Sequence, residues 1–295
     1  MNILPQFIHS FSDTVRRLWE RMNPCVLCPR NCRVHRSKGQ RGFCGITDMP
    51  VVSSVGPLFG EESMLVGKGG SGTIFFAGCN LGCIFCQNYD ISHHRQGREM
   101  TIEQLVQAML ELQRYGCINI NFVTPTHVIA PIIAAIELAR TKGLTLPTVY
   151  NTGGYDSVET LELIAGYIDI YMPDMKYSDG DTAEGLASAV DYPEINFAAV
   201  KEMRRQVGDL KIEKGVAARG LLVRHLVLPN GLAGSEKIID FLAEHVSTAT
   251  AINVMDQYRP CYRASSNHRI NRRPAPEEIE SVNRYAVQKG LRVIS

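Results

Sequence analysis

Three cysteines stand close together in the segment 78–86, at Cys79, Cys83 and Cys86. They directly follow an apolar run, 73–78, that is typical of a buried strand. Iron–sulfur clusters are bound by cysteine thiolates, and a [4Fe–4S] cluster has four irons to ligate. Three local thiolates leave one iron without a protein ligand, and an open coordination position distinguishes a reactive metal centre from a structural one. The spacing therefore predicts a [4Fe–4S] cluster with one open iron.

The order strand, Cys79, Cys83, Phe85 and Cys86 resembles the signature of the radical S-adenosylmethionine (SAM) superfamily. The resemblance implies that SAM chelates the open iron through its amino and carboxylate groups. It also implies that an electron from the cluster cleaves SAM and releases a 5′-deoxyadenosyl radical. Structural zinc is the alternative interpretation of clustered cysteines, but such zinc usually takes four protein ligands and no fourth is local here.

Over about residues 24–260 the chain is similar to the activating-enzyme branch of this superfamily, that is, to pyruvate formate-lyase activating enzyme and its PflX-like relatives. The segments that carry the similarity are CVLCPRNCRVHR, GCNLGCIFCQNYDIS, FVTPTHV, YNTGGYD, YMPDMKY, VRHLVLPN and NVMDQYRP. The similarity implies hydrogen abstraction from a protein or peptide, such as a glycine Cα of a glycyl-radical enzyme, with flavodoxin or ferredoxin as a low-potential electron donor. Two alternatives stay open: radical chemistry on a small molecule or another peptide, and a non-enzymatic Fe–S protein that transfers electrons.

Strand and helix patterns alternate from residue 73 onward. The expected strands are 73–78, 118–124, 147–152, 167–173, 220–229 and 250–256, and the expected helices are 101–116, 127–143, 157–166, 181–190, 194–207, 235–246 and 276–290. Near-continuously apolar strands separated by helices are typical of a parallel sheet covered by helices. Six such units predict an α/β fold, a partial (β/α)6 barrel of the TIM type over 73–295, with its site at the carboxyl ends of the strands.

Polar side chains end or follow several of these strands, and each is a candidate for binding SAM or the substrate. The candidates are Thr124, Thr126, His127, Asn151, Thr152, Asp174, Lys176, Arg224, His225, Asn253 and Met255. In the family a Gly-Gly-Glu segment after the second strand binds the SAM amino group. This chain lacks that glutamate, so the resemblance implies that Thr126 or His127 binds the SAM amino group instead. No catalytic residue is expected, because the deoxyadenosyl radical itself abstracts hydrogen.

The candidates also have plainer interpretations. These are an N-cap for Thr126, a turn for Asn151 and Thr152, a surface ion pair for Asp174 and Lys176, a core ion pair for Arg224 and core packing for Met255. Alternation along the strand places Arg224 and His225 on opposite faces of the sheet, so only one of them points into the barrel. A charged residue inside a barrel needs a partner, which the SAM carboxylate would provide.

A second group of cysteines lies in the predicted N-terminal domain, 1–72, which comprises a short amphipathic helix and a metal-binding cap. The group is Cys25, Cys28, Cys32 and Cys44. Residues 20–72 are rich in Cys, Gly, Pro and Arg and show little periodicity, which is typical of a segment that metal holds together. Four thiolates predict a closed tetrahedral site that zinc or a second Fe–S cluster would fit. The remaining Cys117 and Cys261 are predicted to be buried structural thiols.

Composition narrows the class of protein further. Thirty-one basic and thirty acidic residues give a net charge of +1, which disfavours nucleic-acid binding through overall charge. No apolar run reaches the roughly 18 residues of a membrane span, and the N-terminus lacks the features of a signal peptide. A cytoplasmic location is therefore expected, where nine cysteines favour metal binding over disulfides. Arginines within 259–273 form a basic loop that either binds an acidic group or is solvated surface.

Overall fold

The computed structural model describes residues 11–294 and is built around one sheet of ten strands. The strands are β1 (Val51–Leu58), β2 (Ser71–Phe76), β3 (Arg98–Glu99), β4 (Ile120–Val123), β5 (Thr148–Thr152), β6 (Ile170–Pro173), β7 (Lys211–Glu213), β8 (Val216–Leu226), β9 (Ala251–Met255) and β10 (Arg292–Ile294). Their order in the sheet is β10-β9-β8-β6-β5-β4-β2-β1-β3, and β7 pairs with β8 alone. The six expected strands are β2, β4, β5, β6, β8 and β9, and they are parallel neighbours as predicted.

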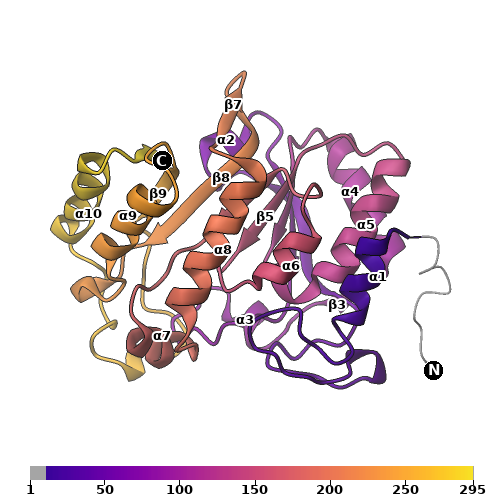
Figure 1. Cartoon of the computed structure of the whole chain (residues 1–295), viewed down its shortest axis with the longest axis horizontal. Helices are drawn as coiled ribbons and strands as arrows, with labels where there is room; N and C mark the ends of the chain where they lie inside the picture. The colour runs from indigo at the N-terminus through magenta and orange to yellow at the C-terminus, as the bar shows by residue number, and fades with distance from the viewer. Residues whose placement is uncertain (1–10, 295) are drawn as a thin grey trace.

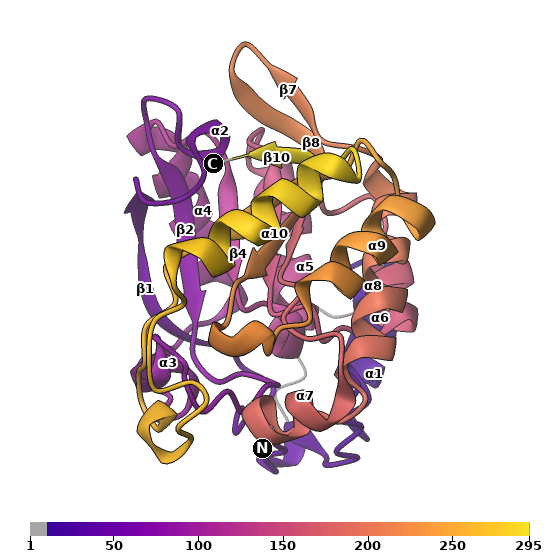
Figure 2. The same cartoon turned by 90° about the vertical axis from the view of Figure 1, so that its left-hand side faces the viewer.

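The longer helices cover the outer face of this sheet. The α-helices of residues 11–294 are α1 (Asp13–Glu20), α2 (Ser63–Val66), α3 (Tyr89–Ser92), α4 (Ile102–Tyr115), α5 (Ile129–Thr141), α6 (Val158–Leu163), α7 (Gly180–Ala187), α8 (Tyr192–Val207), α9 (Ser235–His245) and α10 (Pro276–Gln288). Figure 1 shows α5, α6 and α8 in front of the strands, and Figure 2 shows α10 crossing beside α9. Outward side chains such as Phe122, Tyr150 and Val223 belong to the core beneath these helices.

Local signals set the helix ends where the sequence predicts them. The Thr101 side chain accepts a hydrogen bond from the Gln104 backbone, and the Gln104 side chain completes the capping box. Gly116 ends the same helix in the left-handed conformation, with φ of 101°. Ser157 caps α6, and Pro276 occupies the first turn of α10. None of the helices in residues 11–294 is both long and apolar enough to cross a bilayer.

The sheet is open rather than closed into a barrel. Within residues 11–294 its edge strands, β3 and β10, do not pair with each other. The mostly parallel α/β sheet is confirmed, but the predicted barrel is not. On the inner face, Met64 and Leu65 of α2 pack against Val149 and Leu222. This short helix therefore fills one end of the inner face and leaves the carboxyl ends of the strands free for a site.

The strand β1 lies in a segment predicted to have no regular structure. It pairs antiparallel with β2 from Val52 opposite Phe76 to Leu58 opposite Ser71, with an irregularity near Val52. Its burial does not alternate, so the sequence carries no strand period there. The domain boundary predicted at residue 72 consequently falls between two paired strands.

In the rest of the N-terminal region, α1 packs on α5 and α6, and the loops that follow it lie at the carboxyl ends of the strands. The amphipathic helix α1 is confirmed, with Val15, Leu18 and Trp19 buried, although residues 1–10 lie outside the described part of the chain. The indigo loops that follow α1 in Figure 1 lie at the same end of the sheet as α3 and α7. We call residues 21–50 the cap. It contains all four cysteines of the predicted second site.

Candidate functional site

The three predicted cluster ligands line one cavity at the carboxyl ends of the strands. Cys79, Cys83 and Cys86 follow β2 and enclose a space of about 170 Å³ together with side chains from β4, β5 and β8 and from the segment that follows β6. Six of the predicted SAM or substrate residues also line this cavity, namely Thr124, Asn151, Thr152, Asp174, Lys176 and Arg224. The strand order explains the convergence, because parallel strands present their carboxyl ends at the same edge.

The cysteine loop fits an iron–sulfur cluster. The Leu81 backbone N–H lies 3.3 Å from the Cys79 sulfur, and the Ser92 hydroxyl lies 3.1 Å from the Cys86 sulfur. Such donors stabilise thiolate sulfur and help to set the potential of a cluster. Burial raises the pKa of Cys79 to about 12 and that of Cys83 to about 11. These thiols are therefore protonated near neutral pH until a metal displaces their protons.

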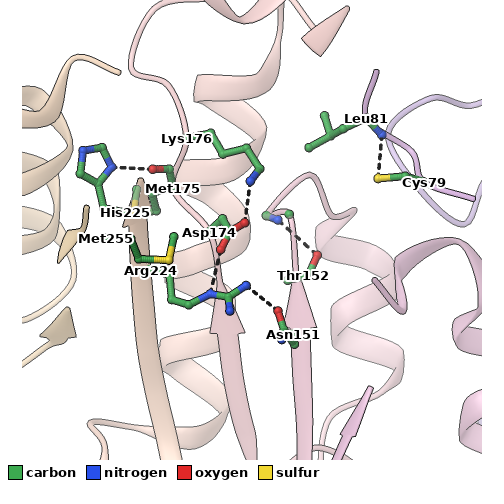
Figure 3. A network of polar contacts seen from close by, with 12 residues as sticks. Cys79, Leu81, Asn151, Thr152, Asp174, Met175, Lys176, Arg224, His225 and Met255 are labelled. Carbon is green, nitrogen blue, oxygen red and sulfur yellow. Dashed lines mark hydrogen bonds and ion pairs between the residues drawn. The ribbon is translucent and has the colours of Figure 1, made fainter. Parts of the chain in front are cut away.

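A buried network of charges lies beside this loop (Figure 3). The Arg224 guanidinium donates to Asp174 Oδ1 at 2.9 Å and to Asn151 Oδ1 at 2.7 Å. The Lys176 ammonium lies 2.6 Å from Asp174 Oδ2. Burial alone would raise the pKa of Asp174, but the charges of Arg224 and Lys176 outweigh it and hold the pKa below its usual value. Asp174 and Lys176 therefore form a buried ion pair rather than the surface pair that was the plainer interpretation.

Two acidic residues of this network were not predicted. Glu61 Oε2 lies 3.6 Å from Arg224 Nη1, and Asn253 donates to Glu62 Oε1 at 2.8 Å. Burial raises the pKa of Glu61, against the opposing charge of Arg224. Both glutamates lie between β1 and α2, in a segment where the sequence predicts neither a strand nor a motif. No sequence pattern marks them, because their role depends on α2 lying against β8 and β9.

Arg224 and His225 lie on opposite faces of β8, as alternation predicts. Arg224 points inward, whereas the His225 ring faces the helices and contacts the carbonyl oxygen of Met175 at 2.7 Å and the Ser235 hydroxyl at 2.8 Å. His225 therefore lies outside the cavity. Met255 lies beside Arg224 without lining the cavity, and so its position does not support the predicted role in binding SAM or the substrate.

Thr126 and His127 also lie away from the cavity. The Thr126 hydroxyl donates to the buried carboxylate of Asp156 at 2.7 Å and contacts the Thr152 hydroxyl at 3.0 Å. It makes no capping bond, so neither the SAM interpretation nor the N-cap interpretation fits its position. The His127 Nε2 lies 2.9 Å from the carbonyl oxygen of Ala77. Thr126 and His127, which were predicted to take the role of the missing glutamate, therefore lie behind the cluster loop.

The buried position of His225 leads to a pH dependence of stability. Burial lowers its pKa from the usual 6.5 to about 4. Between these values the unfolded chain binds a proton that the folded chain does not, so the ring contributes stability above about pH 6.5 that is lost as the pH falls to about 4. We expect the free energy of unfolding, measured in urea, to fall across this window and to fall less steeply in His225→Gln. The exposed His268→Gln variant is the control, and equal slopes in all three proteins would contradict the prediction.

The four cysteines of the cap line a second, smaller cavity, together with Arg30, Arg36, Phe43, Asn80 and His127. This cavity adjoins the cluster loop. Arg30 Nε donates to the carbonyl oxygen of Asn80 at 2.8 Å. A Cβ at Gly78, whose φ is +79°, would lie 2.7 Å from the carbonyl oxygen of Cys44, so only glycine fits this close approach. In residues 11–294 no three His, Cys, Asp or Glu side chains are already arranged as a metal site, so a metal would have to draw the thiols together.

The basic C-terminal loop packs on the other side of the cluster loop. The Arg263 backbone N–H donates to the carbonyl oxygen of Ile84 at 2.8 Å. Tyr258 packs edge-on against Phe85 with 5.4 Å between ring centroids, and Tyr262 stacks on His93 at 4.6 Å. The loop therefore covers the cluster loop from the side opposite the cap.

The two isolated cysteines differ in burial. Cys117 is buried as predicted. Cys261 is only half-buried, which corrects the prediction, because it belongs to the loop that packs over the cysteine loop rather than to the core.

Comparison with known proteins identifies the family. The pattern that defines the radical SAM superfamily matches residues 73–208. An uncharacterized protein of Methanocaldococcus jannaschii is 33% identical over 279 residues, which cover 92% of this chain and 76% of that protein. The chain belongs to the radical SAM superfamily. Membership implies a [4Fe–4S] cluster and SAM as cofactors, and a reductant to supply electrons.

The other similarities are more distant and do not identify the reaction or the substrate. The pyruvate formate-lyase-activating enzyme of Clostridium pasteurianum is 28% identical over 134 residues, 43% of this chain and 55% of that enzyme. A radical SAM methyltransferase from Sphaerobacter thermophilus has a TM-score of 0.49 at 16% identity, covering 75% of this chain and 65% of its own. Streptococcus suis SuiB, solved with S-adenosylmethionine, has a TM-score of 0.49 at 13% identity, covering 73% of this chain and 47% of its own. The similarity to an activating enzyme is therefore partial, and the PflX-like assignment is not confirmed.

Proposed function

We propose that the [4Fe–4S] cluster is bound by Cys79, Cys83 and Cys86, and that this enzyme abstracts a hydrogen atom from a protein or peptide. The supporting observation is that these three thiols share one cavity with the buried charges of Asp174 and Arg224. SAM carries an ammonium and a carboxylate group at its amino acid end. It therefore fits an open iron that lies beside paired positive and negative side chains. Neither a closed zinc site nor a simple electron carrier needs such a cavity.

Each residue of the cavity has a distinct part in this proposal. Lys176 and Arg224 bind the SAM carboxylate, and Asn151 binds a ribose hydroxyl through its amide. Asp174 holds both cations in place, since it contacts each of them. Cys79, Cys83 and Cys86 would hold the cluster, which when bound would provide the electron for reductive cleavage of SAM and so the means of hydrogen-atom abstraction.

The substrate and the reductant belong to the same proposal. The partial similarity to an activating enzyme supports a glycine Cα of a glycyl-radical enzyme as the hydrogen donor, and flavodoxin or ferredoxin as the source of electrons. Modification of a small molecule or of another peptide is the alternative. The loop 257–273 covers the cluster loop. A substrate would have to pass beside this loop or displace it to reach the cavity.

Product analysis tests the proposal. The protein is reconstituted anaerobically with iron and sulfide, reduced with dithionite and given SAM. We expect 5′-deoxyadenosine by mass spectrometry, and a change in the EPR signal of the reduced cluster when SAM is added. Absence of both results would overturn the radical SAM activity of this chain.

Isotope transfer then separates the two substrate classes. Candidate glycyl-radical proteins and glycine peptides carry deuterium at the glycine Cα. Deuterium in the 5′-deoxyadenosine would support hydrogen abstraction from a polypeptide. Unlabelled product from every such substrate, together with turnover of a small molecule, would support the alternative.

A further inference from the structure

The cavity of the cap contains two arginines, Arg30 and Arg36, and in residues 11–294 neither forms an ion pair, although the charge of Arg36 still reaches the half-buried Asp48. Arg36 is only 1% exposed, and it donates to the carbonyl oxygens of His127, at 2.6 Å, and Thr47. Arg30 donates to the carbonyl oxygens of Asn80 and Ala187, and its guanidinium lies 3.8 Å from the centroid of the Phe43 ring. Carbonyl oxygens satisfy the N–H donors but do not cancel the charge. A buried cation is normally paired with an anion, and Arg36 has no carboxylate at pairing distance, so its position favours a further anion in this cavity.

The four thiols of the same cavity can provide that anion. As neutral thiols they carry no charge that would balance the arginines. As thiolates on a zinc ion, four negative charges and the +2 of the metal give a net charge of −2. An oxidised [2Fe–2S] or [4Fe–4S] core of charge +2 gives the same total. Two arginines balance this charge.

His127 provides a second observation at the same cavity. Its Nε2 must donate to the carbonyl oxygen of Ala77, because a carbonyl oxygen can only accept. Its Nδ1 is therefore the acceptor nitrogen, and it has no hydrogen-bond partner although the residue is only 1% exposed. A buried acceptor nitrogen without a partner, in a residue that lines a cavity, indicates a metal ion or a hydrogen-bond donor that binds there.

We propose that the cap binds a metal centre through Cys25, Cys28, Cys32 and Cys44, and that Arg30 and Arg36 balance its negative charge. The two arginines also connect this centre to the cluster loop. Arg30 bonds the backbone at Asn80, and Arg36 bonds the backbone of His127, whose ring bonds the backbone at Ala77. Ala77 and Asn80 lie on either side of Cys79. The centre thus supports both ends of the first ligand segment of the [4Fe–4S] cluster.

Metal analysis of the full chain tests the site independently of the radical chemistry. In the Cys79→Ala/Cys83→Ala/Cys86→Ala variant we expect one equivalent of zinc, or iron with sulfide, per chain. Adding Cys28→Ser and Cys32→Ser is expected to remove it. Zinc without visible absorption identifies a zinc site, whereas iron, sulfide and charge-transfer absorption identify a cluster. A folded triple variant that binds no metal would overturn the proposal while leaving the radical SAM activity of the wild-type chain intact.

Competition with a chromogenic chelator tests the role of the arginines. Loss of an outer-shell partner typically weakens metal binding about 10–100-fold, so we expect a change of that size in Arg36→Met and partial recovery in Arg36→Lys. Arg204→Met is the matched control, because Arg204 pairs with Asp209 on α8, away from the cap. If circular dichroism shows that Arg36→Met is unfolded, Arg30→Met replaces it. Wild-type affinity in the folded arginine variant would refute the proposed charge balance.

Discussion

The Cys83→Ala variant is expected to lose both the [4Fe–4S] cluster and all 5′-deoxyadenosine formation. Cys83 is the central cysteine of the loop and is buried at 9% exposure, and its loss leaves only two of the three proposed cluster ligands. Iron and sulfide per chain, the visible spectrum and mass spectrometry of the SAM products are the measurements.

Cys117→Ala is the matched control, because Cys117 is also buried but precedes β4, at the end of the strands opposite the cluster loop. We expect it to retain the cluster and the activity. If Cys83→Ala still forms 5′-deoxyadenosine at the wild-type rate, the three-cysteine loop is not the site of SAM cleavage. Loss of activity in Cys117→Ala would point instead to a general effect on folding.

The Arg224→Met variant is expected to lose about 3–5 kcal/mol of unfolding free energy, which is typical when one partner of a buried ion pair is removed. Arg224 neutralises Asp174 directly and lies near Glu61, so its removal leaves buried carboxylates without a counter-charge. Urea unfolding at neutral pH measures the loss. Any fraction that stays folded should no longer bind SAM, as equilibrium dialysis would show.

Arg284→Met provides the comparison, because Arg284 pairs with Glu280 in solvent on α10. Exposed pairs contribute at most about 1 kcal/mol, so this variant should unfold almost as the wild type does. Similar small losses in both variants would show that water, rather than Arg224, stabilises the carboxylates. Adding Asp174→Asn to Arg224→Met should recover part of the stability, since it removes one of the unpaired charges.

Features that depend on neighbouring residues were predictable from the sequence. The Cys79–Cys86 spacing, the capping box at Thr101 and the opposite facing of Arg224 and His225 each depend on a few consecutive residues. The parallel order of six strands followed from the repeated strand–helix pattern. These signals lie within a single element or between adjacent elements, so one sequence is enough to read them.

Features that depend on contacts between distant segments were not predictable. Glu62 and Asn253 are 191 positions apart in the chain and form a hydrogen bond, and no sequence motif links the two residues. Thr126 and His127 follow a strand end, as pocket residues do, but the tight turn after β4 directs them behind the cluster loop. The sequence showed that polar groups gather at this edge but not which way each one turns.

The glutamates before α2 also limit how the protein can be divided or recombined. Residues 73–208 match the superfamily pattern, but Glu61 precedes that stretch and Arg224 and Asn253 follow it. A fragment cut to the matching residues would lack β1, β8 and β9 and would leave Asp174 without its arginine. For grafting substrate specificity between relatives, the unit of exchange is therefore the sheet with segments 51–72 and 216–256 included. Exchange of a shorter segment would separate Arg224 from Asp174 and Glu61 and leave buried charges unpaired.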